Sequence, residues 1–119
     1  MGGNNKLALM QPHTLTKQQM SLKLSSAGKA DIVQIVMQAN ISRPNNFTSL
    51  STDEWIWIVD KIQSHPKYKR ISLEKLNIII ENGIIGKYND RQPAINAFTI
   101  FKWIETWWNE TPDDQKGIE

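Results

Sequence analysis

The sequence of 119 residues contains no cysteine, which excludes several kinds of chemistry. Without a thiol there can be no disulfide, no thiolate nucleophile and no metal or iron–sulfur site that needs a cysteine ligand. Of the two histidines, neither has the His-x-x-x-His or Glu-x-x-His spacing of metal ligands. There is also no nucleophile elbow and no P-loop spacing. The sequence therefore predicts a protein that is not an enzyme and that needs no metal or cofactor.

Long apolar runs are missing as well. No stretch approaches the ~20 apolar residues of a membrane span. The run at residues 7–10 is shorter than the apolar region of a signal peptide. We therefore expect no membrane partner, and the cysteine-free chain suits the cytoplasm.

The net charge is only +2, but it is unevenly distributed. Residues 1–50 hold five basic and one acidic residue, residues 60–91 hold seven and four, and residues 92–119 hold two and five. A basic start and centre with an acidic end are compatible with a polyanionic partner. A solvated surface of mixed charge explains the same asymmetry equally well.

The chain is long enough for one compact domain. Apolar residues recur at helical spacing, which predicts an all-α fold, a small bundle of four or five helices in residues 14–110. We expect a flexible arm at residues 1–13 and a frayed acidic tail at residues 111–119. The expected helices cover residues 15–24, 30–39, 52–63, 73–82 and 96–109.

One of these helices has an ambiguous pattern. Residues 32–37 are rich enough in β-branched side chains for a strand, whereas Ile32, Ile35, Val36 and Ala39 have helical spacing. We predict a helix, because a lone strand would have no partner in this sequence.

Local signals set the ends of the later helices. Ser51 and Glu54 form a capping box, and Ser72 and Asn96 are N-cap residues of the next two helices. Asn-Gly at residues 82–83 is a stop signal, so Gly83 is expected to be left-handed after the helix.

Some large apolar residues lie away from the predicted core stripes. Trp57 and Ile78 lie roughly opposite the buried stripes of their helices, and Trp103 flanks its own stripe. Exposed aromatic residues are common anchors of protein interfaces, so these three residues are the interface candidates. The alternative is that another helix or the N-terminal arm covers them.

Basic residues gather in the second half of the chain. They could neutralise phosphates, and Tyr68 and Tyr88 among them could stack on exposed bases. The alternative is a solubilising turn between helices. The candidate phosphate contacts are Lys67, Lys69, Arg70, Lys87 and Arg91.

Three stretches, residues 71–76, 81–88 and 95–103, together resemble small helical proteins of bacteriophages and mobile elements. The shared pattern is a helix, a Gly86-Lys87-Tyr88 connection and a helix with Thr99-Ile100-x-x-Trp103. Asn89 stands where a second glycine is more typical. The resemblance implies an accessory factor of phage or plasmid replication, similar to helicase loaders or replisome organisers.

Together these observations predict a non-enzymatic accessory protein of a phage or mobile element that acts through a protein partner, with DNA as a further candidate partner. The competing hypothesis is a structural or host-directed interaction module, such as a virion component or an inhibitor, that binds no nucleic acid.

Overall fold

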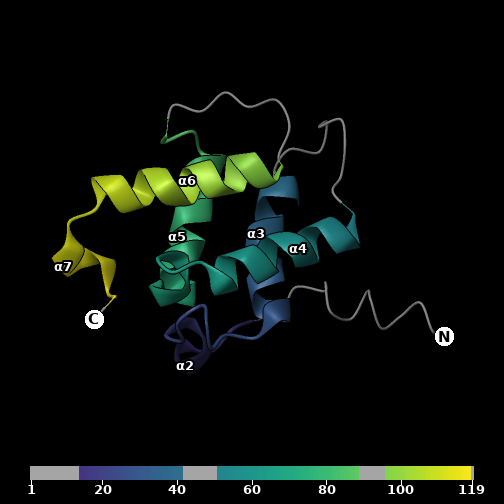
Figure 1. Cartoon of the computed structure of the whole chain (residues 1–119), viewed down its shortest axis with the longest axis horizontal. Coiled ribbons are helices and arrows are strands. Elements are labelled where there is room, and N and C mark those ends of the chain that lie inside the picture. Colours follow the sequence, from purple (N-terminus) through teal and green to yellow (C-terminus); the bar gives the residue numbers. More distant parts are fainter. Residues whose placement is uncertain (1–13, 42–50, 89–95, 119) are drawn as a thin grey trace.

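The computed structural model describes residues 14–41, 51–88 and 96–118 (Figure 1). The predicted arm at residues 1–13 and Arg91 lie outside this part of the chain. The described residues form six α-helices and a 3-10 turn, with no strand beyond one isolated bridge, so the all-α class is confirmed. The elements are α2 (Lys17–Met20), α3 (Lys29–Ile41), α4 (Thr52–Ser64), η1 (Tyr68–Arg70), α5 (Leu73–Ile84), α6 (Ala97–Glu110) and α7 (Asp113–Lys116).

The central helix is α3, which confirms the helix prediction for residues 30–39. It packs against both α4 and α5 and buries Ile32, Val33, Ile35, Val36 and Ala39. A helix with neighbours on two sides carries apolar residues around most of its circumference. This burial explains why its sequence lacks a clean single stripe.

A capping box starts α4, as predicted. The Ser51 hydroxyl accepts a hydrogen bond from the Glu54 amide at 3.2 Å, and the Glu54 carboxylate accepts one from the Ser51 amide at 3.0 Å. The Ser51 amide, and then the Ser51 side chain, hold the pKa of the Glu54 carboxyl below its usual value. The side chains of Ser72 and Asn96 cap α5 and α6 in the predicted way.

The predicted end of α5 was wrong. Gly83 lies inside the helix and is buried, whereas Gly86 has a φ of 82°. The Gly86 amide donates to the Gly83 carbonyl at 3.1 Å, and the Lys87 amide donates to the Asn82 carbonyl at 2.9 Å. This pair of bonds is a Schellman motif with Gly86 as the left-handed residue. The stop signal therefore acts three residues later than expected.

Gly83 stays in the helix because Trp103 of α6 lies against it. A Cβ atom at Gly83 would come within 2.2 Å of Trp103 Cδ2. Trp103 is fully buried, so its predicted place in an exposed interface was wrong. The missing side chain at Gly83 makes room for the indole and lets α6 lie directly on α5.

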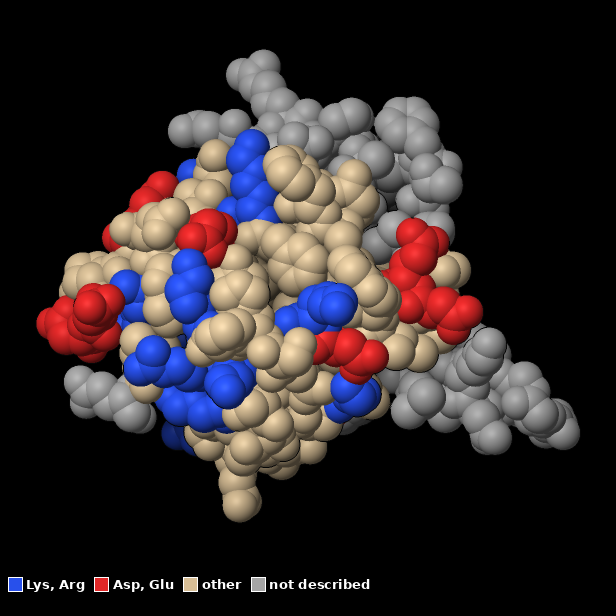
Figure 2. Space-filling view, viewed as in Figure 1, with Lys and Arg blue, Asp and Glu red and all other residues tan. Residues whose placement is uncertain are grey.

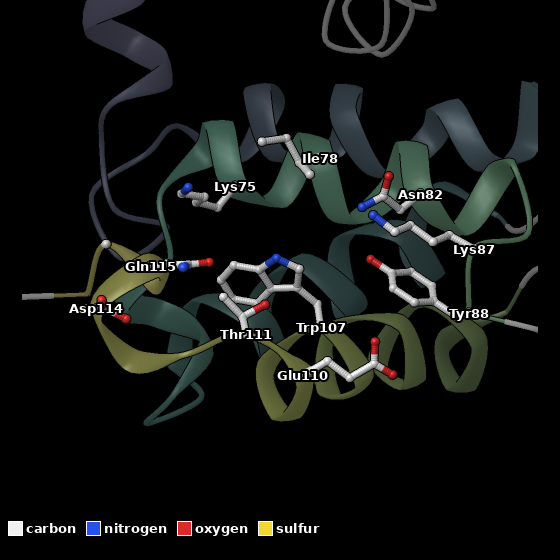
Figure 3. A pocket seen from close by; sticks show the side chains of 11 residues that line it. Lys75, Ile78, Asn82, Lys87, Tyr88, Trp107, Glu110, Thr111, Asp114 and Gln115 are labelled. Carbon is white, nitrogen blue, oxygen red and sulfur yellow. The ribbon is translucent and has the colours of Figure 1, made fainter.

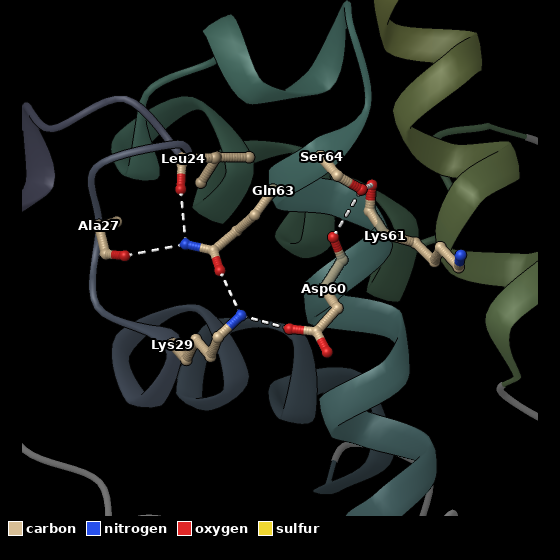
Figure 4. Close-up of polar contacts among 7 residues, drawn as sticks. All are labelled: Leu24, Ala27, Lys29, Asp60, Lys61, Gln63 and Ser64. Atoms are coloured by element: carbon tan, nitrogen blue, oxygen red, sulfur yellow. Dashed lines mark hydrogen bonds and ion pairs between the residues drawn. The ribbon is translucent and has the colours of Figure 1, made fainter.

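The segment before α3 is mostly not helical. A helix was predicted at residues 15–24, but α2 covers only Lys17–Met20. The Gln63 side-chain amide of α4 donates to the carbonyls of Leu24 and Ala27 at 2.9 and 3.0 Å (Figure 4). Lys29 in turn donates to the Gln63 side-chain oxygen at 2.8 Å and pairs with Asp60. These contacts fix the loop to α4 without helical hydrogen bonds.

Residues 111–118 include the short helix α7 and a buried lysine, so the prediction of a frayed tail was wrong for these residues. Lys116 of α7 is buried, lies 4.9 Å from the Trp108 ring centre and pairs with Asp113 at 2.6 Å. The Lys23 ammonium also donates to the Gly117 carbonyl. Within the described ranges, no helix combines the length and the hydrophobicity that a membrane span requires.

Candidate protein-binding face

The surface between α4 and α6 exposes large aromatic side chains from both helices. From α4, Trp57 is 51% exposed. From α6, Phe98 is 64% exposed, and Phe101 is half-buried beside Trp57. We call Trp57, Phe98 and Phe101 the aromatic face. In Figure 2, residues other than Lys, Arg, Asp and Glu cover much of the surface between α6 and α4, with acidic groups where α4 begins.

Ring contacts hold the aromatic face in place. The rings of Trp57 and Phe101 meet edge to face with centroids 6.4 Å apart, and the Lys61 ammonium lies 5.5 Å from the Trp57 ring centre. Phe101 is stacked at 6.4 Å on Tyr68, which is itself stacked on His65 at 3.8 Å. Trp57 is therefore exposed to solvent but supported by α6.

Two hollows lie beside Trp57. One of about 310 Å³ opens toward the start of α4, between Glu54 and Phe98. The other, of about 520 Å³, opens toward the end of α4, beside Lys61 and His65. The exposed ring can insert into a partner, and the two hollows beside it can receive the partner's side chains.

A polar cluster closes one end of the aromatic face. Glu105 of α6 accepts hydrogen bonds from the Lys67 ammonium at 2.8 Å and from the Tyr68 hydroxyl at 2.6 Å. These bonds hold the pKa of the Glu105 carboxyl below its usual value. Burial, and then the Glu105 carboxylate, raise the pKa of the Tyr68 phenol. The cluster ties α6 to the turn after α4.

The three predicted interface residues do not lie together. Trp57 is exposed on the aromatic face, whereas Trp103 is buried between α5 and α6. Ile78 is exposed, at 37%, but it lines a different groove. The structure thus keeps Trp57 as an interface candidate, places Ile78 on another surface and removes Trp103.

The groove at Ile78 runs between α5 and the segment from α6 to α7, with a volume of about 660 Å³ (Figure 3). Lys75 and Lys87 extend from the α5 side of the groove, and Glu110 and Asp114 come from the opposite wall. Cations and carboxylates therefore share the groove, which disfavours a ligand of a single charge sign.

The predicted phosphate contacts are also dispersed. Lys67 is occupied by Glu105, and Tyr68 is buried, so the prediction that this tyrosine could stack on bases was wrong. Lys87 lines the α5–α6 groove, away from Lys69 and Arg70 in η1.

Lys69 and Arg70 instead lie near Lys23. The amide of Ser25 donates to the Lys69 carbonyl at 3.2 Å. Lys23 and Arg70 donate to the carbonyls of the consecutive residues Gly117 and Ile118. Figure 2 shows basic side chains gathered on this side of the molecule, between α2 and α7. We call Lys23, Lys69 and Arg70 the basic cluster.

Sequence reasoning missed Phe98, the most exposed residue of the aromatic face. At about 100° per residue, Phe98 lies roughly opposite Ile100 and Trp107, which are buried. The argument that identified Trp57 would therefore have identified Phe98. The contact between Trp57 and Phe101 had no such signal, because it joins residues 44 positions apart.

Metal ligands do not gather in the described residues, where no three His, Asp or Glu side chains lie close enough together to hold an ion. Comparisons of the chain with protein-family models, curated proteins and solved structures found no match.

Proposed function

We propose that this chain is a non-enzymatic accessory protein that binds a protein partner through its aromatic face. The observation that carries the proposal is the exposure of Trp57 and Phe98 side by side on two different helices, around one hollow. Contiguous exposed apolar surface marks interaction sites, and tryptophan is enriched among residues that dominate binding energy.

A site-specific photo-crosslinker tests this function in cells that produce the protein. Benzoylphenylalanine in place of Phe98 is expected to give a discrete adduct, and Trp57→Ala in the same chain should remove it. The matched control carries the crosslinker in place of Ile85, which is 76% exposed outside the aromatic face. No adduct from position 98, or the same adducts from both positions, would contradict the proposal.

The biological setting that we propose is replication of a phage or mobile element, in the cytoplasm. It is supported by the resemblance of residues 71–108 and by the absence of cysteine. The alternative remains a virion component or a host-directed inhibitor. A flanking helicase gene would favour the first setting, and a flanking capsid gene the second.

DNA binding is the second candidate function, favoured by the basic cluster. Phosphate contacts weaken steeply with salt, so even weak binding is expected to be visible at about 50 mM salt. Lys69→Ala with Arg70→Ala should abolish retention of DNA, whereas Lys102→Ala, an exposed lysine on α6, should not. A wild-type chain that is not retained at this salt concentration would exclude this function.

A further inference from the structure

The exposed side of α4 forms a single stripe opposite its buried side. Trp55, Ile58, Val59 and Ile62 are buried. The residues on the other side recur at intervals of three and one, which is the spacing of one helix face. The exposed stripe of α4 consists of Asp53, Ile56, Trp57, Asp60, Lys61 and Ser64.

Opposite charges lie at equal distances on the two sides of Trp57 along this stripe. Asp53 stands four residues before Trp57, and Lys61 stands four residues after it. At 1.5 Å per residue, each charge lies about 6 Å along the helix from the tryptophan. The remaining acid, Asp60, is already paired with Lys29. The stripe therefore has an acidic end, an apolar middle and a basic end.

We propose that two copies of this chain pair through the exposed stripe of α4, antiparallel about a two-fold axis at Trp57. This inference rests on the proposed function of the aromatic face and names the partner as a second copy. An antiparallel arrangement places Asp53 of each copy opposite Lys61 of the other. A parallel arrangement would place like charges together, which is unfavourable.

In a two-fold symmetric dimer, each contact of the exposed stripe occurs twice. An isologous contact needs a self-complementary patch, because the same residues meet on both copies. The hollow between Trp57 and Phe98 is open to an apolar side chain from the second copy. The antiparallel α4 helices also place the positive end of each helix dipole beside the negative end of the other, which is favourable.

Sedimentation of the full chain tests the pairing. As the protein concentration rises to about 500 µM, the measured mass is expected to rise toward twice the 13.7 kDa of one chain. Trp57→Ala is expected to weaken dimerisation at least about thirtyfold, because it removes the central anchor. Ile85→Ala is the control and should leave the dimer unchanged. A wild-type chain that stays monomeric throughout, or a Trp57→Ala chain that dimerises normally, would overturn the proposal.

A charge exchange tests the antiparallel geometry independently of folding. Asp53→Lys alone and Lys61→Asp alone each create like-charge contacts, repeated by symmetry, and each is expected to weaken the dimer about tenfold. The double variant restores opposite charges across the axis and should recover most of the affinity. A double variant weaker than both single variants would overturn the geometry.

The crosslinking experiment separates this inference from the proposed function. An adduct between position 98 and a different protein, with a monomeric wild-type chain, would overturn the dimer and leave the proposed function in place. The absence of any adduct from position 98 would overturn the proposed function itself.

Discussion

The two sides of α6 meet their neighbours in different ways. On the side of α5, Trp103 lies directly on Gly83, and both residues are buried. On the side of α4, Phe101 meets Trp57 edge to face, and Trp57 remains half exposed. We call the first contact the α5–α6 seam and compare it with the aromatic face.

The difference shows that aromatic content alone does not decide which side of a helix is closed. The seam closes because Gly83 has no side chain, so the Trp103 indole of α6 can lie directly against the α5 backbone. On the other side, aromatic rings face one another and leave hollows beside Trp57. We therefore expect the seam to determine stability and the aromatic face to determine binding.

Alanine in place of each tryptophan, in separate variants, is expected to show the largest difference between the α5–α6 seam and the aromatic face. Trp103→Ala leaves a large cavity in the core and is expected to lower the free energy of unfolding by about 4 kcal/mol. Trp57→Ala, its matched control, removes a half-exposed ring and should cost less than about 1 kcal/mol. Urea denaturation measures both. Equal losses would mean that the aromatic face belongs to the core.

Gly83 inside α5 and Gly86 just after it provide the next test. Gly83→Ala forces a methyl group into the Trp103 ring and is expected to cost about 3 kcal/mol. Gly86→Ala has free space around the new methyl group, and its cost of about 1 kcal/mol arises from the positive φ. Denaturation of the two variants side by side checks the order. A Gly83→Ala variant as stable as Gly86→Ala would show that the seam can separate without loss.

The features that could be predicted from the sequence depend on near neighbours. The caps at Ser51, Ser72 and Asn96 follow from residues three positions away, and all three were predicted correctly. The end of α5 was not, because whether Gly83 stops the helix depends on Trp103, twenty residues later. At this position, tertiary packing outweighs the local propensity of Asn-Gly to form a turn.

The same difference between local and long-range contacts explains which parts of the candidate site could be predicted. Trp57 was predicted as exposed because its helix alone shows which side is apolar. Tyr68 was expected to be free for stacking, but Phe101 and Glu105 cover it from α6, more than thirty residues away. The basic residues of this turn suggested a nucleic-acid site because the sequence does not show that Glu105 pairs with Lys67.

The polar cluster at the end of the aromatic face provides the smallest and most specific test. Glu105 joins α6 to Lys67 and Tyr68 by charged hydrogen bonds, whereas the seam is apolar. The folded-state pKa of Glu105 lies below that of the unfolded chain. Its contribution to stability is therefore complete above the unfolded pKa of about 4.3 and is lost as the pH falls through and below that value.

Glu105→Gln should accordingly destabilise the chain by about 1 kcal/mol at pH 7, the order expected for a partly exposed charged hydrogen bond. The difference from wild type should shrink toward pH 3, where a protonated Glu105 resembles glutamine. The Trp103→Ala variant, by contrast, should show the same loss in the free energy of unfolding at pH 7 and at pH 3, because no titrating group is removed. Denaturation at pH 7, 5 and 3 measures these differences. A Glu105→Gln loss that does not change with pH would show that charge does not hold this side of α6.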